Sequence, residues 1–209
     1  MKRALILDLD NTIYPVKSIA ADLFEKLFQL IDEEIGLSDK QKAAKAKSEL
    51  TRRPYQHVAD EYGFSKELKQ KGLDLLKNFS YDKPMKPYPE YHALSALAID
   101  KFLVTTGFTK LQNSKIEKLG IKAHFKKIYI VDPEVSKINK GDIFQQIMLE
   151  NRYKAQDLLV IGDDPQSEIK FARELGIDTY LFDPEQKFSD VDVTYASISY
   201  TNVADIINQ

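Results

Sequence analysis

Two aspartates stand two residues apart at the end of a short apolar run near the beginning of the chain. The run is Leu-Ile-Leu at residues 5–7, and Asp8 and Asp10 follow it. Alternate residues of a strand point to the same face, so we expect both carboxylates on one side of a strand that packs into a core. Like charges this close raise each other's pKa unless a divalent cation or a shared proton relieves the repulsion. In the alternative, Asp10 merely caps a turn with the polar residues after it.

The composition is that of an ordinary globular protein. The 209 residues are enough for one core, or for one core with a small accessory domain. There are 30 basic and 32 acidic residues, with a formal net charge of −2, so the charge gives no reason to expect a nucleic-acid partner. The absence of cysteine excludes disulfides and thiolate metal sites.

The sequence gives no sign of export or of a membrane partner. The apolar run Ala4–Leu7 is shorter than the roughly 7–15 residues that a signal peptide needs. No apolar stretch approaches the ~20 residues needed to cross a bilayer. We therefore expect a cytoplasmic protein, either a monomer or a homodimer.

Residues 15–87 predict an all-α subdomain inserted into the chain. Leucines recur at helical spacing over 23–36, and a Ser-Asp pair is a typical cap for a further helix over 40–50. A third helical stretch covers 65–78. Three prolines within six residues exclude regular structure in 81–89, which we interpret as the return linker.

Strands and helices alternate after this insertion. Expected strands cover 101–105, 127–131, 157–161, 178–182 and 191–197, and expected helices cover 109–119, 141–151, 165–175 and 203–208. Alternation with short connections predicts an α/β fold, a doubly wound Rossmann-like parallel sheet built from residues 1–14 and 88–209. In open sheets of this kind, ligands bind beyond the carboxyl ends of the strands.

Four groups of polar residues follow strands of the predicted sheet, and the topology brings them to one edge. They are Asp8 with Asp10; Thr105 with Thr106 and Gly107; Lys140; and Asp163 with Asp164 and Glu168. Lysines are usually solvated, and Lys137, which lies one turn earlier, is the alternative to Lys140.

These four motifs, in this order and on these elements, resemble the haloacid dehalogenase superfamily in its branch of magnesium-dependent phosphatases. The resemblance runs from Leu5 to about Phe182. It implies hydrolysis of a phosphomonoester, with a small phosphorylated metabolite such as a nucleotide or a sugar phosphate as substrate. It also implies that Asp8 is the nucleophile that forms an aspartyl-phosphate, and that Asp10 protonates the leaving oxygen and then activates water.

The resemblance also implies groups that bind the phosphoryl oxygens. Thr105 would donate a hydrogen bond to one of them, and Lys140 would neutralise their charge. Asn11, Thr106 and Gly107 lie in loops whose backbone amides would surround the phosphate.

Magnesium is the implied cofactor, and it prefers oxygen ligands. Asp8, the backbone carbonyl of Asp10 and Asp163 would hold it, with Asp164 and Glu168 in the outer shell. Glu168 also fits a solvated first-turn residue that the helix dipole favours. Relatives often carry aspartate at that position, so the contact of this longer side chain stays open.

The same resemblance makes the inserted helices a cap that closes over the site and selects the substrate. Arg52 and Arg53, with an aromatic residue nearby, are candidates for holding an anionic or planar leaving group, although an exposed helix end explains the same residues. Tyr14 is similar to a residue of nucleotide and sugar-phosphate phosphatases of the superfamily.

Three other functions remain open. One is a phosphomutase of the same fold (β-phosphoglucomutase-like), which the motifs do not separate from a hydrolase. Another is a halide-releasing hydrolase, which needs no metal and leaves Asp10 and Asp163 unexplained. The last is a binding module without turnover, which the intact motif residues disfavour.

Overall fold

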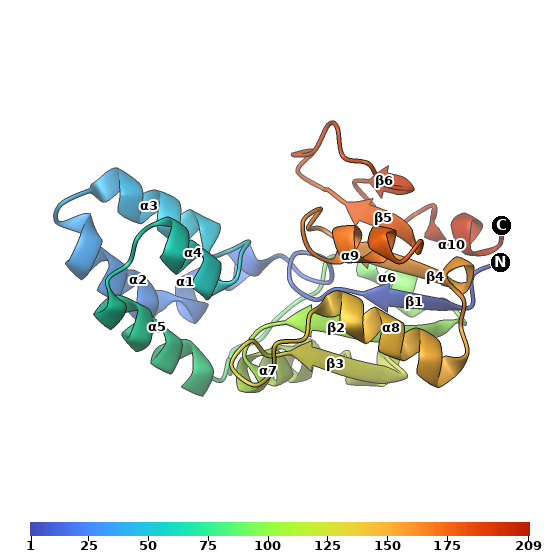
Figure 1. Ribbon diagram of the computed structural model, residues 1–209, viewed down its shortest axis with the longest axis horizontal. Helices are drawn as coiled ribbons and strands as arrows, with labels where there is room; N and C mark the ends of the chain where they lie inside the picture. The colour runs from blue at the N-terminus through green and yellow to red at the C-terminus, as the bar shows by residue number, and fades with distance from the viewer.

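The computed structural model describes residues 1–209, and its core is a sheet of six parallel strands (Figure 1). The strands are β1 (Ala4–Leu7), β2 (Asp100–Thr106), β3 (Lys127–Val131), β4 (Leu158–Gly162), β5 (Asp178–Phe182) and β6 (Tyr195–Ser197). Their order is β3-β2-β1-β4-β5-β6, so β1 lies inside the sheet between β2 and β4. The core is a doubly wound Rossmann-like α/β fold, as the alternation of strands and helices predicts.

Helices cover both faces of the sheet because its strands are apolar on both sides. They are α6 (Tyr91–Ser95), α7 (Thr109–Leu119), α8 (Lys140–Asn151), α9 (Glu168–Glu174) and α10 (Val203–Ile207). Ala4 and Ile6 of β1 pack in one apolar cluster with residues of α8 and α9. Leu5 and Leu7 pack in the other, with residues of α6, α7 and α10. Alternation along β1 thus separates the two layers.

A group of short helices, here called the helical unit, forms the other end of the molecule. It contains α1 (Ala20–Leu23), α2 (Glu25–Ile31), α3 (Lys40–Glu49), α4 (Tyr55–Glu61) and α5 (Lys66–Asn78), and a π-helical stretch (Asp32–Gly36) extends α2. The Asp39 side chain caps α3 by accepting a hydrogen bond from the Lys42 amide. Ser65 caps α5 in the same way at the Leu68 amide.

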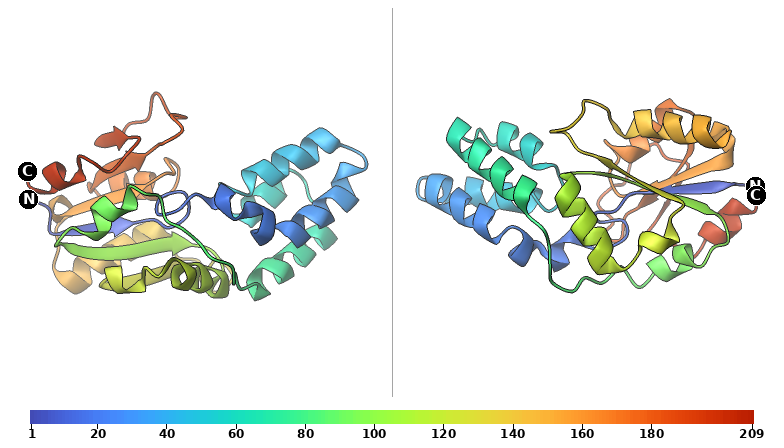
Figure 2. Two further views of the ribbon diagram at one scale, coloured as in Figure 1. Left: turned by 180° about the vertical axis from the view of Figure 1, so that it is seen from behind. Right: turned by 90° about the horizontal axis from the view of Figure 1, so that it is seen from below.

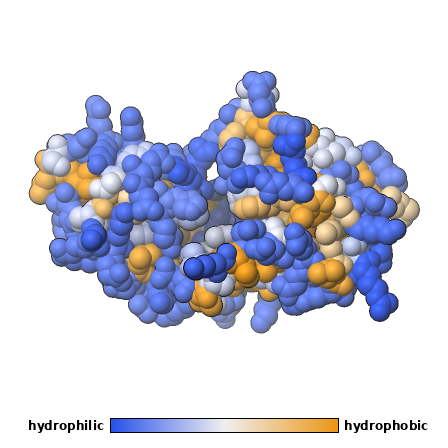
Figure 3. Space-filling view, in the orientation of Figure 1, coloured by the Kyte–Doolittle hydropathy of each residue, from blue (hydrophilic) through white to orange (hydrophobic).

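Two connectors join the helical unit to the sheet, and they contain the domain boundaries that we expect at residues 14–15 and 87–88. They lie side by side, since the Tyr88 amide donates to the Ile13 carbonyl at 2.8 Å (Figure 2). The surface is hollowed between the helical unit and the sheet (Figure 3). Both chain termini lie at the opposite end of the sheet (Figure 1).

Some elements differ from the sequence-based expectations. Helices α4 and α6 have seven and five residues, too few for a helical period to be recognised. The helix expected over 165–175 begins at Glu168, because the Asp164 side chain accepts from the Gln166 amide and holds a turn first. The strand expected over 191–197 forms only at its end, since the Thr194 side chain replaces the backbone as hydrogen-bond partner of β5.

None of the helices combines the length and the apolar character that a membrane span requires.

The close approach of α4 and α5 depends on Gly72. A Cβ atom at this position would lie 2.1 Å from Tyr55 Oη, whose hydroxyl donates to the Leu68 carbonyl at 2.9 Å. We expect Gly72→Ala to lower the free energy of unfolding by about 1–3 kcal/mol, as overpacking does. Denaturant unfolding measures this, with the exposed Gln70→Ala on the same helix as a control expected within about 0.5 kcal/mol of the wild type. Equal stability of both variants would contradict the packing argument.

Candidate active site

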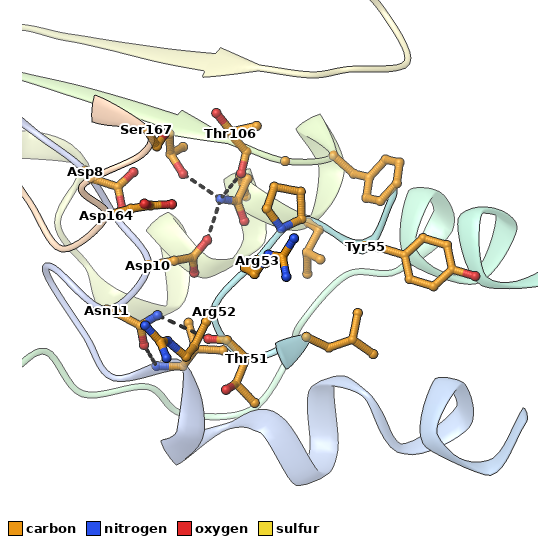
Figure 4. Close-up of a pocket in the computed structure, with 18 of the residues that line it drawn as sticks. Asp8, Asp10, Asn11, Thr51, Arg52, Arg53, Tyr55, Thr106, Asp164 and Ser167 are labelled. Carbon is orange, nitrogen blue, oxygen red and sulfur yellow. Dashed lines mark hydrogen bonds between the residues drawn. The ribbon is translucent and has the colours of Figure 1, made fainter. Parts of the chain in front are cut away.

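A cavity of about 150 Å³ lies where the carboxyl ends of β1, β2 and β4 face the helical unit. The side chains that line it include those of all four sequence motifs and a segment of the helical unit between α3 and α4. Figure 4 shows Asp8, Asp10 and Asp164 on the core side, with Arg52, Arg53 and Tyr55 approaching from the helical unit. Residues far apart in the sequence thus meet in one place, as expected for the edge of a parallel sheet.

Asp8 is buried and is paired with a buried lysine. The Lys140 Nζ donates to Asp8 Oδ1 and to Glu168 Oε2, each at 2.6 Å. Lys140 is in place because Asn139 and Asp142 form a capping box that begins α8 at this residue. The alternative lysine, Lys137, is exposed on the preceding loop. The structure therefore brings Lys140, and not Lys137, to Asp8.

Glu168 lies much deeper than a solvated first-turn residue, with 2% of its surface exposed. Its Oε1 accepts from the Asp164 amide at 2.8 Å, while Oε2 accepts from Lys140. The space for this side chain exists because β4 ends at Gly162, where a Cβ would lie 2.2 Å from the Glu168 carboxylate. Glu168, whose contact the sequence left open because its side chain is longer than aspartate, thus reaches into the centre of the site.

These acids carry more negative charge than Lys140 neutralises. Burial raises the pKa of Asp8 to about 7, against the opposing charge of Lys140. Burial, with the charges of Glu168 and Asp8, raises the pKa of Asp163 well above its usual range. Burial disfavours the charged form of Lys140, but Asp8 and Glu168 together raise its pKa. The centre thus favours the arrival of a further positive charge.

The arrangement of the acids fits a divalent cation. Ligand atoms of Asp8, Asp163 and Glu168 all lie within 4.8 Å of one another, and all are carboxylate oxygens, which Mg²⁺ prefers. Both Glu168 oxygens already accept hydrogen bonds, so Asp8 and Asp163 are the better candidates for direct ligands. Thr12 orients Asp163 by donating to Oδ1 at 3.3 Å.

Asp164, predicted with the metal ligands, stands apart from this triad. Its Oδ1 accepts from the Gln166 amide at 2.8 Å, a contact that shapes the turn before α9. Burial and the nearby Glu168 charge raise its pKa. Asp164 lines the cavity, but the structure does not group its carboxylate with the three acids that lie together.

Asp10 has a cation of its own. Lys115 Nζ donates to Asp10 Oδ1 at 2.8 Å, the Tyr14 hydroxyl donates to the same oxygen, and Gln112 Nε2 donates to Oδ2 at 2.9 Å. Burial opposes ionisation, but Lys115 and these hydrogen bonds lower the pKa of Asp10 below its ordinary value. Lys115 and Gln112 are not among the site residues predicted from the sequence, although both fall on the buried face of a predicted helix, where a polar residue is unusual.

The second motif lies beside the first, because β1 and β2 are neighbouring strands. The Thr105 Oγ1 accepts from Gln112 Nε2 at 2.7 Å, and Thr105 is 1% exposed. Gly107 has φ +153°, a region that favours glycine, and its amide donates to the Val131 carbonyl at 3.0 Å. That amide is therefore engaged in the sheet, which leaves the Thr105 hydroxyl and the backbone around Thr106 as the groups of this loop that line the cavity.

Asn11 connects the first motif to the helical unit. Its Nδ2 donates to the Thr51 carbonyl at 3.1 Å, and its Oδ1 accepts from the Val16 amide at 3.1 Å (Figure 4). Arg53 is paired with Glu49 and with Glu61, the latter at 2.6 Å.

Arg52 is exposed, lines the cavity, and has no acidic partner within ion-pairing distance. Of the two arginines predicted to hold the leaving group, it is the one whose guanidinium is free.

Comparison with known proteins places the chain in a family. The model of the haloacid dehalogenase-like hydrolases matches residues 2–176. No curated protein sequence matches the chain.

Solved structures that resemble the chain include the HAD-hydrolase YfnB from Bacillus subtilis, bound to magnesium (21% identity, TM-score 0.70, 100% of this chain and 99% of that one). Others are the haloacid dehalogenase-like protein SP0104 from Streptococcus pneumoniae (18% identity, TM-score 0.72, 98% of both chains) and the HAD phosphatase from Thermococcus onnurineus (16% identity, TM-score 0.65, 99% and 98%). The similar structures also include 2-haloacid dehalogenases. At these identities the likeness shows the fold alone.

The acidic triad predicts that Mg²⁺ stabilises the folded protein, and that this stabilisation depends on Asp163 but not on its neighbour Asp164. At ~100 times its dissociation constant, the ion should raise the free energy of unfolding by ~2.7 kcal/mol, which shifts the midpoint of thermal unfolding by roughly 5–10 °C. We expect Asp163→Asn to lose most of this shift and Asp164→Asn to keep most of it. Thermal unfolding of chelator-treated protein with and without MgCl₂ measures both. An Asp163→Asn protein with the full shift would show that the triad does not hold the ion.

Proposed function

Because this chain belongs to the haloacid dehalogenase-like hydrolases, we propose that it is a magnesium-dependent phosphatase acting through an aspartyl-phosphate on Asp8. The observation that carries the proposal is the pair of aspartates after β1, Asp8 buried and Asp10 partly buried, each held by its own buried lysine. Such a pair offers one carboxylate for attack and a second for proton transfer, and the acids around Asp8 fit a divalent cation. Its expected substrates are small phosphorylated metabolites.

In the first step, one Asp8 oxygen attacks phosphorus while the bond to the leaving oxygen breaks. Asp10 gives the leaving oxygen a proton and, as a carboxylate, then accepts one from the water that hydrolyses the aspartyl-phosphate. Lys140 holds Asp8 in place and neutralises charge that builds up on the phosphoryl oxygens, and Thr105 donates a hydrogen bond to one of them. A Mg²⁺ ion held by Asp8, the Asp10 carbonyl and Asp163 would supply further neutralisation of that charge.

The helical unit fits the role of a cap over this site. It contributes apolar side chains and Arg52 to the cavity wall, so it contacts whatever group the phosphate is attached to. A cavity of about 150 Å³ accommodates a small leaving group such as a sugar or part of a nucleoside. The core then determines the reaction and the cap selects the substrate.

Replacing the nucleophile tests the proposal directly. We expect Asp8→Asn to abolish Mg²⁺-dependent hydrolysis of p-nitrophenyl phosphate, because an amide does not form the acyl-phosphate, while the fold remains intact by circular dichroism. Release of inorganic phosphate measures the activity. If this variant kept near-full turnover, Asp8 would not be the nucleophile.

The same assays separate the other candidate reactions. Glucose 1-phosphate that is isomerised instead of hydrolysed would identify a phosphomutase, and chloride release from 2-chloropropionate without Mg²⁺ would identify a dehalogenase. We expect no metal-independent chloride release, because that reaction gives no role to the acid–base aspartate or to the acidic triad. The product formed from glucose 1-phosphate, free phosphate or isomerised sugar, decides between the hydrolase and the mutase.

The two arginines of the cap should differ in their effect on substrate binding. We expect Arg52→Ala to raise KM for phosphorylated metabolites about tenfold with little change in kcat, since a hydrogen bond to a charged group contributes ~1.5 kcal/mol. Arg53→Ala is the matched comparison and should change KM much less, because Arg53 is already paired with Glu49 and Glu61. Steady-state kinetics of both variants measure this, and equal increases in KM would show that the pairing of Arg53 does not restrict it.

A further inference from the structure

Two buried polar side chains on α7 are unexplained by the fold. Gln112 and Lys115 are one helical turn apart, 1% and 4% exposed, on the face that also buries Leu111 and Ile116. Burying an amide and an ammonium costs free energy unless both are hydrogen-bonded. An apolar residue at either position would suit a helix that packs on a sheet, so these two side chains require another reason.

All of their hydrogen bonds lead to the active site. Lys115 Nζ donates to Asp10 Oδ1 at 2.8 Å. Gln112 Nε2 donates to Asp10 Oδ2 at 2.9 Å, to Thr105 Oγ1 at 2.7 Å and to the Thr106 carbonyl at 3.3 Å. No partner of either side chain lies in the helical unit or elsewhere in the core.

The two oxygens of Asp10 therefore have different surroundings. Oδ1 accepts from both Lys115 and the Tyr14 hydroxyl, and the Lys115 ammonium lies 5.8 Å from the centre of the Tyr14 ring. Oδ2 accepts only from Gln112, on the side of Thr105. Oδ1 is thus the fixed oxygen, and Oδ2 is the one that faces the reacting groups.

Gln112 also determines the direction of the Thr105 hydroxyl proton. Because Thr105 Oγ1 accepts from the Gln112 amide, its own hydrogen is free to donate elsewhere. A donor pointing into the cavity is the group that a phosphoryl oxygen needs. The Gln112 amide group therefore fixes the position of the proton-transferring oxygen of Asp10 relative to the phosphate-binding oxygen of Thr105.

The helix that carries the pair is itself fixed at its first turn. The amide and the hydroxyl of Thr109 both donate to Asp132 Oδ2, at 2.7 and 2.8 Å, and Asp132 follows β3. Gln112 lies three residues farther along the same helix. The sheet thus helps to set the position of the pair, together with contacts between α7 and α5.

We propose that Lys115 and Gln112 are positioning residues for leaving-group protonation: they align Asp10 Oδ2 with the phosphate-binding Thr105. The inference rests on the proposed phosphatase function. In the step concerned, the Asp8–phosphorus bond forms, the bond from phosphorus to the leaving oxygen breaks, and the Asp10 proton moves to that oxygen to give the free alcohol. Lys115 acts only through Asp10, so its loss affects proton transfer and leaves the Thr105 contact to phosphate in place. Loss of Gln112 affects proton transfer and also frees the Thr105 hydroxyl.

The dependence of the rate on the leaving group tests this. Phenyl phosphate and p-nitrophenyl phosphate are similar in shape, but phenolate is much the stronger base and needs the proton more. We expect Lys115→Met to lower kcat/KM for phenyl phosphate about 10- to 100-fold, within the range of general acid catalysis, and to lower that for p-nitrophenyl phosphate several-fold less. Lys115→Arg, which keeps the cation, should recover part of the loss. Gln112→Leu should show the same preference for the better leaving group.

Lys118→Met is the matched control, since Lys118 is an exposed lysine one turn farther along α7. It should leave both values of kcat/KM unchanged. Circular dichroism and the Mg²⁺-induced shift in thermal unfolding show whether each variant is folded. The same two measurements are made on Lys115→Gln, which retains a hydrogen-bond donor.

An equal loss of kcat/KM for both esters in the Lys115 variants would overturn the proposal in favour of a purely structural role. Wild-type rates in those variants would overturn it as well. A wild-type protein that hydrolyses neither ester in the presence of Mg²⁺ would refute the phosphatase function, and the positioning role would fall with it.

Discussion

The structure depends on the pairing of buried charge at the carboxyl end of β1. Asp8 is buried and Asp10 is partly buried, and each is matched by a buried lysine that comes from a different helix, Lys140 from α8 and Lys115 from α7. These helices lie on opposite faces of the sheet, so the two ion pairs approach the first motif from both layers. Removing one partner of a buried pair leaves an unpaired charge, which typically costs about 3–5 kcal/mol.

This pairing gives the two aspartates different properties although they are only two residues apart. Burial and neighbouring acids raise the pKa of Asp8 to about 7, whereas Lys115 and two further donors bring the pKa of Asp10 below its ordinary value. Asp8 shares Lys140 with Glu168 and has Asp163 beside it, so its surroundings favour a cation. One site can support both nucleophilic and acid–base chemistry when two side chains of the same type have different surroundings.

Much of this could be predicted from the sequence, for a simple geometric reason. Parallel strands end at one edge, so the convergence of Asp8, Thr105 and Asp163 follows from recognising the strands. The features of the site that could not be predicted depend on burial and on packing between distant segments. Helical periodicity places Lys115 on the buried face of its helix but does not reveal that its partner is Asp10. Glu168 lies deep because Gly162 has no side chain to occupy the same space. The short helices α4 and α6 repeat their apolar residues only once, at Tyr55 and Val58 and at Tyr91 and Leu94, which is too short a pattern to indicate a helix, and tertiary packing determines them.

The position of β1 between two strands that follow much later in the sequence affects how the protein folds. Ala4 is in register with Asp100 on one side and with Leu158 on the other, and the whole helical unit lies between the first two strands in sequence. Contacts so distant along the chain make loop closure the slow part of folding, so domains of this kind acquire structure late and cooperatively. During synthesis, β1 is made before either of its neighbours, and the chain as far as Leu158 must follow before its second neighbour, β4, exists. Until then, its apolar side chains and unpaired backbone are available to chaperones or to other chains.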